Sequence, residues 1–457
     1  MTLRIHILVA TVLLVALVSF GTLLSPPFTR LREALGLPEL LPGSRFDGVS
    51  YHVVHPDPEL ARWFHARVIH YYHALFSLLL YATLIALVVR YRIPGYNMVL
   101  LLAGLGAILT TLGGLMYGYF SRVFYWHGVF IAGLAMLFAS GVVALANFKP
   151  RDMLDRALWI SGLLLLIGGV IGGYVGSSYM DDVVREEYLN VNEATRFDPG
   201  LGESNEIWRA KTGHLHAMVA VALTIAFIAA LKFTGVREHR FRRYAEISLL
   251  AGVTVMALAA YAVWFVGGVA HVIITPAALL LIASTLALSF LAETGDKLTP
   301  KWALAWGLRI GNIAMWLLVA IPGALVAMSL RKPLIFNPAF RDPSWDLAEL
   351  AYNIGHWHIL VLAWGVTLVL IALNMINWKP LLQALLGLVA VVGFLGASIG
   401  FNLYVFTAKP GYLNPYDNIW VKALIEPSLA LTSIPVAAVA VLLVLGASRR
   451  EMLRIED

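Results

Sequence analysis

The chain has 457 residues, of which 60% are hydrophobic and 13% are charged, and its formal net charge is +6 at pH 7. Its apolar runs reach the roughly 20 residues that cross a bilayer, which excludes a soluble multidomain protein, and its basic residues lie in short loops, which argues against nucleic-acid binding. It contains no cysteine, so disulfides, thiolate-bound iron–sulfur clusters and covalently attached c-type haem are excluded.

Hydropathy predicts an all-α integral membrane protein in which residues 1–457 form a single membrane domain of twelve transmembrane helices. The boundaries are good to about three residues, and the predicted spans are 5–24, 65–89, 96–119, 123–147, 157–178, 212–233, 244–267, 269–292, 302–328, 353–376, 380–405 and 427–447. The first span is interpreted as a retained helix, because it is long for a signal peptide and lacks a cleavage motif before Pro26. The outer loops are long and are expected to be ordered: 25–64, 179–211, 329–352 and 406–426.

Charge sets the predicted orientation. If the N-terminus is inside, the short inner connections carry an excess of Lys and Arg, as in the stretch from Lys232 to Arg243, and the outer loops do not. This distribution follows the positive-inside rule, so both termini are predicted to be cytoplasmic in the plasma membrane. The acidic stretch from Asp181 to Glu206 is interpreted as a solvated face, with a docking patch for a basic redox partner as the alternative.

Histidines recur near the predicted outer ends of spans 2, 6 and 10. They are His70 and His73, His214 and His216, and His356 and His358. Spans 4 and 8 begin near His127 and His271, so the twelve spans are predicted to form three pseudo-repeated arcs of four. Residues two apart on a helix point about 200° apart, so an HxH pair can serve partners on opposite sides. An imidazole in a bilayer is costly unless it is ligated or hydrogen-bonded, and haem is the predicted partner.

Span 10, with the sequence Gly355-His356-Trp357-His358, resembles the tenth helix of subunit I of the haem–copper oxidase superfamily, which includes nitric oxide reductases. The resemblance covers nearly the whole chain by topology and rests on the three motifs in spans 2, 6 and 10. It implies that His356 ligates a high-spin haem, that His358 ligates a low-spin haem, and that His73 is the other axial ligand of the low-spin haem. It also implies that span 6 supplies a ligand to a non-haem metal.

Span 7 departs from that family, because the stretch from Ala260 to Val266 contains no pair of adjacent histidines. The tyrosine expected four residues after the histidine of span 6 is also missing, since Met218 and Ala220 stand there. A non-haem metal normally needs three histidines, and besides span 6 only His271 is placed to contribute one. We therefore expect a relative that keeps haem and lacks the non-haem metal.

The first predicted haem site pairs His73 with His358 as the two axial ligands of one low-spin haem. His70 lies on a nearby face of the same helix and is the alternative to His73. For all the membrane histidines, the other interpretation is an ordinary interhelical hydrogen bond.

A second haem is predicted on His356, with either His214 or His216 as its other axial ligand. A haem held by two histidines carries electrons but has no open position for a gas. His127 and His271 are candidates for a third haem site or for hydrogen bonds to haem propionates.

Basic residues near the outer helix ends are candidates for pairing with haem propionates. They are Arg67, Arg122, Arg209 and Lys211. Arg309, inside span 9, is expected to reach back to the inner headgroups, or else to pair with Glu246. His6 is assigned to the terminus without a functional role.

The predicted function is that of a multi-haem b-type membrane cytochrome with two or more haems. It would carry electrons in a respiratory chain between membrane quinol or quinone and a redox protein or cytochrome at the outer face, as an electron-transfer subunit of a larger membrane oxidoreductase complex. Glu426 and His127 are candidate acceptors of quinol protons. One alternative is an oxygen or nitric oxide reductase with a metal held by His214, His216 and His271, and another is a haem-free secondary transporter.

Overall fold

The computed structural model describes residues 3–24, 29–37, 58–91, 93–121, 123–178, 205–326, 344–407 and 418–453, together with residues 183, 187 and 190. Within this part, the chain is helical apart from turns, short connections and two isolated β-bridges. Eleven of its stretches are long and apolar enough to cross a membrane. An all-α chain with several membrane-length helices is therefore confirmed.

The helices divide between two compact units. Unit 1 comprises Met1–Phe148, Asn374–Trp378 and Val436–Asp457, and unit 2 comprises Lys149–Leu373 and Lys379–Pro435. Both units contain helices of membrane length. The division therefore does not test whether they form the single membrane domain predicted from the sequence.

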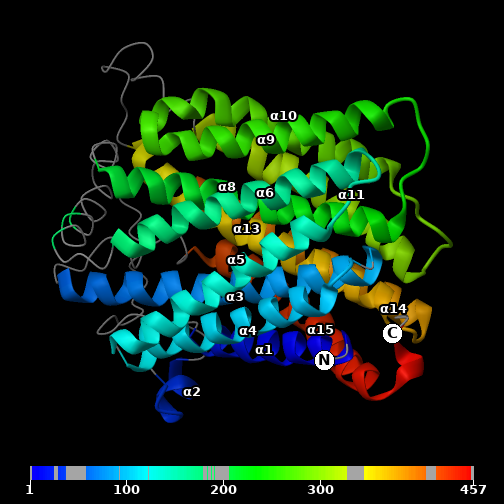
Figure 1. Ribbon diagram of the computed structural model, residues 1–457, viewed down its shortest axis with the longest axis horizontal. Coiled ribbons are helices and arrows are strands. Elements are labelled where there is room, and N and C mark those ends of the chain that lie inside the picture. Colours follow the sequence, from blue (N-terminus) through cyan, green and yellow to red (C-terminus); the bar gives the residue numbers. More distant parts are fainter. Residues whose placement is uncertain are drawn as a thin grey trace. The chain divides into compact units, whose positions relative to one another are not determined.

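In unit 1, α3 packs against α1 and α4, and α4 packs against α5 (Figure 1). The elements are α1 (Leu3–Leu24), α2 (Thr29–Ala34), α3 (Pro58–Tyr91), α4 (Tyr96–Leu115), which continues as the π-helical turn η2 (Met116–Phe120), and α5 (Phe124–Asn147), with the 3₁₀ turn η8 (Arg450–Met452) near the end of the chain. Glycines allow close contact between α4 and α5, because a Cβ at Gly113 would overlap the backbone nitrogen of Phe130 and a Cβ at Gly133 would overlap that of Thr110.

In unit 2, α8 packs against α6 and α9, and α11 packs against α10 and α14. The elements are α6 (Met153–Ser178), α8 (Glu206–Thr234), α9 (Arg242–Val266), the 3₁₀ turn η4 (Gly267–Ala270), α10 (His271–Leu291), α11 (Pro300–Met315), the π-helical turn η5 (Trp316–Ala320), α13 (Ser344–Met375), α14 (Pro380–Thr407) and α15 (Ile419–Ser448). Helices α13 and α15 end in unit 1.

Four helices begin well before the start that hydropathy predicts. The starts of α3 at Pro58, α8 at Glu206, α13 at Ser344 and α15 at Ile419 fall within stretches assigned above to the outer loops 25–64, 179–211, 329–352 and 406–426. Hydropathy marks only the apolar part of a helix, whereas the backbone hydrogen bonds that form a helix continue through polar turns. Residues 408–417 of the fourth outer loop lie outside the described part.

The stretch Arg242–Leu291 counts as one of the eleven membrane-length stretches, yet it consists of the two helices α9 and α10. Gly267 ends α9 with φ 63° and ψ −151°, a conformation that glycine adopts without steric strain. The chain then turns through η4, and α10 packs against α9 (Figure 1). This arrangement agrees with the separate spans predicted at 244–267 and 269–292.

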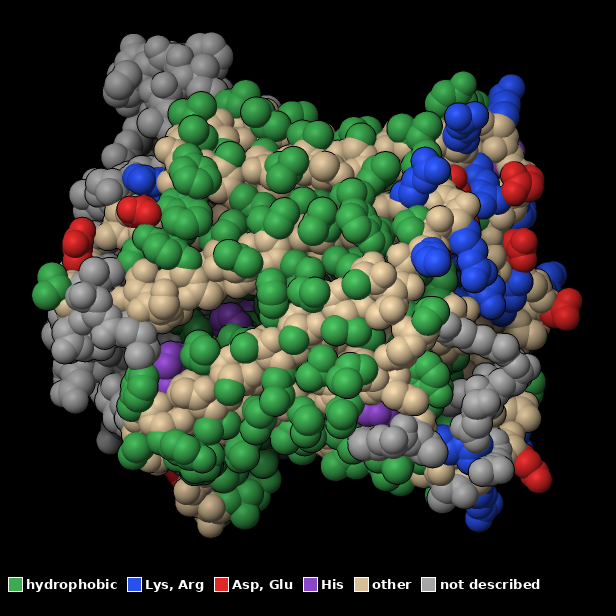
Figure 2. Space-filling model, viewed as in Figure 1, with side chains coloured by type: hydrophobic (Ala, Val, Ile, Leu, Met, Phe, Trp, Pro, Cys, Tyr) green, Lys and Arg blue, Asp and Glu red, His purple; other side chains and the backbone are tan. Residues whose placement is uncertain are grey.

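Charged residues gather in unit 2 at the end where α8 stops and α9 begins, and Figure 2 shows Lys and Arg side chains concentrated there. Lys232 on α8 forms ion pairs with Asp152 and Asp155 at the start of α6, at 2.6 and 2.7 Å. These pairs join the ends of two neighbouring helices. The same end carries the basic stretch that was used to predict the cytoplasmic face.

Arg309 on α11 corrects a prediction. Its side chain is buried and does not pair with Glu246. Its Nε donates to the carbonyl of Ser289 at 3.2 Å and its Nη2 to that of Ala292 at 2.9 Å, while Glu246 binds Arg242. The last carbonyls of a helix have no partner within the helix and carry partial negative charge, so a guanidinium beside the end of α10 satisfies them.

Candidate functional site

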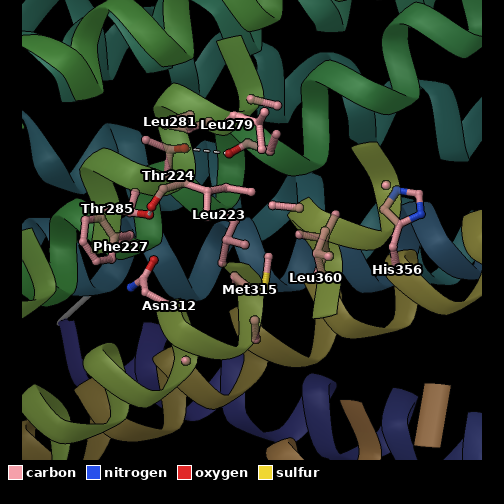
Figure 3. Close-up of a pocket in the computed structure, with 18 of the residues that line it drawn as sticks. Leu223, Thr224, Phe227, Leu279, Leu281, Thr285, Asn312, Met315, His356 and Leu360 are labelled. Carbon is pink, nitrogen blue, oxygen red and sulfur yellow. Dashed lines mark hydrogen bonds between the residues drawn. The ribbon is translucent and has the colours of Figure 1, made fainter. Parts of the chain in front are cut away.

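Unit 2 contains a cavity of about 280 Å³ bounded by α8, α10, α11, α13 and α14. His216, His271 and His356 line it, each from a different helix. Figure 3 shows His356 at one end of the group of lining side chains, with Asn312 and Thr285 toward the other. Between them the wall is mainly apolar: Leu223, Phe227, Leu279, Met315 and Leu360.

His356 is held within its own helix. Its Nδ1 lies 2.9 Å from the carbonyl of Tyr352, one turn earlier on α13. The imidazole also stacks on the Tyr352 ring, with centroids 4.6 Å apart and planes 12° apart. Two contacts to one residue therefore orient this ring at the cavity wall.

His216 and His271 lie close to one another on the cavity wall. Their ring centroids are 5.9 Å apart and their planes are nearly perpendicular. The Nδ1 of His216 lies 2.8 Å from the carbonyl of Thr212, and that of His271 lies 3.0 Å from the carbonyl of Gly268. The structure thus brings together three of the histidines predicted to be functional.

The contacts of Nδ1 fix the tautomer of these side chains. A carbonyl oxygen only accepts a hydrogen bond, so Nδ1 must carry the proton, and Nε2 keeps the lone pair in the neutral ring. A histidine that binds a metal through one nitrogen usually donates the other N–H to such an acceptor. The same arrangement holds for His73, His214, His216, His271 and His356.

His214 does not line the cavity. Its Nδ1 donates to the carbonyl of Gly168 on α6 at 2.8 Å, and a Cβ at Gly172 would come within 2.6 Å of its Cε1. His214 and His216 therefore contact different neighbours, as expected from residues two apart on a helix. Of the two, only His216 lines the cavity together with His356, and the choice between them as the partner of His356 on a haem stays a prediction.

His358 is the other member of the HxH pair on α13 and does not line the cavity either. It is exposed, and its ring stacks on Phe401 of α14 with centroids 4.9 Å apart. His73, its predicted partner, belongs to unit 1 and donates from Nδ1 to the carbonyl of Ile69. The pairing of His73 with His358 joins two units and stays a prediction.

In unit 1, His70 and His127 contact one another directly. Nε2 of His70 lies 3.2 Å from Nδ1 of His127, and the rings of Tyr117 and Phe130 pack on His70 with centroids 4.9 and 4.6 Å away. This is the interhelical hydrogen bond considered above as the alternative to ligation. Ligation of haem by His73, or by His70 in its place, stays a prediction.

The residues predicted to pair with haem propionates, and the predicted proton acceptor Glu426, differ in their contacts and exposure. Arg67 donates to the carbonyl of Gly118, Arg209 donates to that of Trp264, and Lys211 lies over the ring of Trp208. Glu426 is exposed on α15, and Arg122 lies outside the described part of the chain. Pairing with propionates stays a prediction for all four basic residues.

Among the described residues, no three His, Cys, Asp or Glu side chains are grouped closely enough to hold a metal ion. The three-histidine set suggested for a reductase is not assembled there, because His214 faces α6 while His216 and His271 face the cavity.

Sequence reasoning missed two residues of interest. Tyr352 lies four residues before His356, a spacing that places two side chains on one face of a helix and that could have indicated the stack. His6 was assigned no partner or role, whereas it is buried on α1 and its Nδ1 lies 2.5 Å from the hydroxyl of Tyr81. The apolar residues around it gave no sign of this partner on α3.

No protein-family model, no curated protein and no solved structure matches the chain. Membership of the haem–copper oxidase superfamily therefore stays a prediction from the three histidine motifs.

Proposed function

We propose that the chain is a multi-haem b-type cytochrome of the plasma membrane, with twelve membrane crossings in three arcs of four and both termini in the cytoplasm. It transfers electrons between membrane quinol or quinone and a redox protein at the outer face, as a subunit of a larger complex. The resemblance to the haem–copper oxidase superfamily supports this proposal, together with the arrangement of histidines in unit 2.

One observation carries the proposal. His216 and His356, on helices more than a hundred residues apart in the chain, line one apolar cavity, and each donates its Nδ1–H to a backbone carbonyl. Both rings therefore keep the Nε2 lone pair that a metal ligand needs. Small residues in the wall, such as Ala220 and Gly311, are compatible with a flat macrocycle. The donor set and the apolar wall fit haem.

In this proposal His216 and His356 hold the iron of one b-type haem, which would supply a one-electron redox centre there. The residues of the chain set its environment. The carbonyls of Thr212 and Tyr352 keep the two imidazoles in the ligating tautomer, and Leu223 and Leu360 contribute to a mainly apolar wall around the site. A second haem on His73 and His358 completes the proposed electron path.

A specific observation favours a second candidate, an oxygen or nitric oxide reductase. His271 lines the same cavity as His356, and its ring lies beside that of His216. In that case His356 alone would hold the haem, and His216 and His271 would contribute to a separate metal site. A haem with one protein ligand keeps an open position, so it would bind carbon monoxide.

Substitution of single histidines tests the proposal. We expect His216→Leu and His356→Leu each to lose one haem per chain, measured as pyridine haemochrome on purified protein, because each removes an axial ligand. His214→Leu is the matched control and should keep the full haem content, since His214 contacts α6. A wild-type protein purified in folded form without haem would refute the proposal.

The two candidates differ in their metals. The cytochrome should contain only haem iron, show low-spin spectra and not bind carbon monoxide. The reductase should contain a stoichiometric second metal that is lost in His271→Leu, together with a haem that binds carbon monoxide.

A further inference from the structure

We infer that Tyr352 is a positioning residue for His356, which fixes the orientation of this imidazole at the wall of the cavity. This rests on the proposed function insofar as His356 is there an iron ligand. The contacts that carry the inference belong to the chain itself and do not require haem.

Tyr352 contacts His356 in two ways. Its carbonyl accepts a hydrogen bond from Nδ1 at 2.9 Å, and its ring lies nearly parallel to the imidazole, with centroids 4.6 Å apart. The torsion that turns a histidine ring has a broad energy profile. Rotation of His356 about it would break the hydrogen bond and the stack together, so the two contacts select one ring orientation.

The Tyr352 ring is itself fixed at its far end. Its hydroxyl donates to the carbonyl of Val319 at 2.9 Å. Val319 belongs to η5, a π-helical turn, and such turns interrupt the regular hydrogen bonding of an α-helix and are frequent at functional sites. The neighbouring carbonyl of Leu318 accepts from Asn402 at 2.7 Å, so side chains of two other helices use carbonyls of this turn.

The segment after η5 also provides the space for the tyrosine. A Cβ at Gly323 would clash with the Tyr352 hydroxyl. Val319 and Gly323 are one turn apart, so the same helix supplies both the acceptor and the room. The imidazole orientation is therefore set jointly by α13 and by the helix that follows η5.

The orientation has a chemical consequence at an iron ligand. The electronic structure of a ferric haem with two imidazole ligands depends on the angle between the two ring planes, and the strength of the Nδ1–H hydrogen bond alters the basicity of the ligand. Removal of the hydrogen bond that fixes the Tyr352 ring should therefore change the spectrum and the reduction potential of this haem, while the haem stays bound.

The first test uses Tyr352→Phe, which removes the hydroxyl and keeps the ring. Tyr261→Phe is the matched control, because the Tyr261 hydroxyl also donates to a backbone carbonyl of another helix, that of Leu164, and Tyr261 does not line the cavity. We expect full haem content in both. In Tyr352→Phe alone, the electron paramagnetic resonance signal of one haem should broaden and shift, and its potential should move.

A second pair of variants leaves the tyrosine in place. Gly323→Ala should displace the Tyr352 hydroxyl and reproduce the spectral change. Gly365→Ala should not, because Gly365 lies on α13 like Tyr352, has open space around its Cβ position and does not line the cavity.

A readout independent of haem completes the test. In dithionite-reduced protein with ¹⁵N-labelled histidine, assigned with His356→Gln, solid-state NMR should show a single Nδ1–H signal for His356. In Tyr352→Phe this signal should broaden or split.

If haem is present and the electron paramagnetic resonance spectrum, the reduction potential and the NMR signal of Tyr352→Phe all match those of the wild type, the inference is wrong while the proposed function stands. If the wild type holds no haem, the proposed function fails, and the NMR signal alone decides the role of Tyr352.

Discussion

At the scale of the residue, His214 and His216 are two positions apart on α8, yet His214 donates to a carbonyl of α6 and His216 lines the cavity. His70, predicted as an alternative ligand, is hydrogen-bonded to His127. In each case the direction of the side chain around its helix selects the partner, and neighbouring helices decide which direction is buried.

Arg309 illustrates the same point with a measurable effect on stability. We expect Arg309→Gln to lower the free energy of unfolding by about 2 kcal/mol, because two charge-assisted hydrogen bonds to the buried end of α10 are lost. Arg240→Gln, at an exposed position, is the control and should have little effect. Thermal unfolding of the purified variants in detergent measures both, and equal melting temperatures would contradict the capping role.

At the scale of the element, apolar runs located most helices but not their polar first turns. Hydropathy placed α4 and α5 at 96–119 and 123–147, and the structure has Tyr96–Leu115 with η2 and then Phe124–Asn147. It could not predict how closely the two helices approach. That distance depends on Gly113 and Gly133, whose missing side chains bring the backbones together.

We expect Gly113→Ala and Gly133→Ala each to destabilise the protein by about 1–3 kcal/mol, since an added methyl group must push α4 and α5 apart. Gly128→Ala is the control, because Gly128 lies on α5 like Gly133 and no atom lies near its Cβ position. Melting temperatures in detergent should fall for the first two variants only. A Gly128→Ala variant that is equally unstable would show that the loss of stability does not come from the contact between α4 and α5, since alanine favours a helix more than glycine does.

At the scale of the whole molecule, the membrane acts as a solvent that limits the possible folds. Backbone groups in hydrocarbon must be satisfied internally, so long apolar stretches form helices. Eleven such stretches occur in the described residues, and one of them turns back at Gly267. The twelve crossings and the cytoplasmic termini are proposed from this pattern together with the distribution of Lys and Arg.

The proposed orientation is tested with reporter fusions. Fusion of a fluorescent protein within the loop of Arg237 to Phe241, between α8 and α9, should give fluorescence in cells, because that loop is predicted to be cytoplasmic. Alkaline phosphatase fused within 179–204 should be active, since it requires an external location. The reverse pattern of activities would overturn the orientation and the assignment of the histidines to the outer side.

The sequence by itself determined that this chain is a helical membrane protein and that its histidines gather near the starts of particular helices, because hydropathy and charge act locally along the chain. Only the tertiary structure decided that His216, His271 and His356 share a cavity, that His214 does not, and that Tyr352 holds His356. The physical reason is that rotation of a helix about its axis and contact between helices far apart in sequence depend on how side chains of several helices pack together. No single stretch of sequence contains that information.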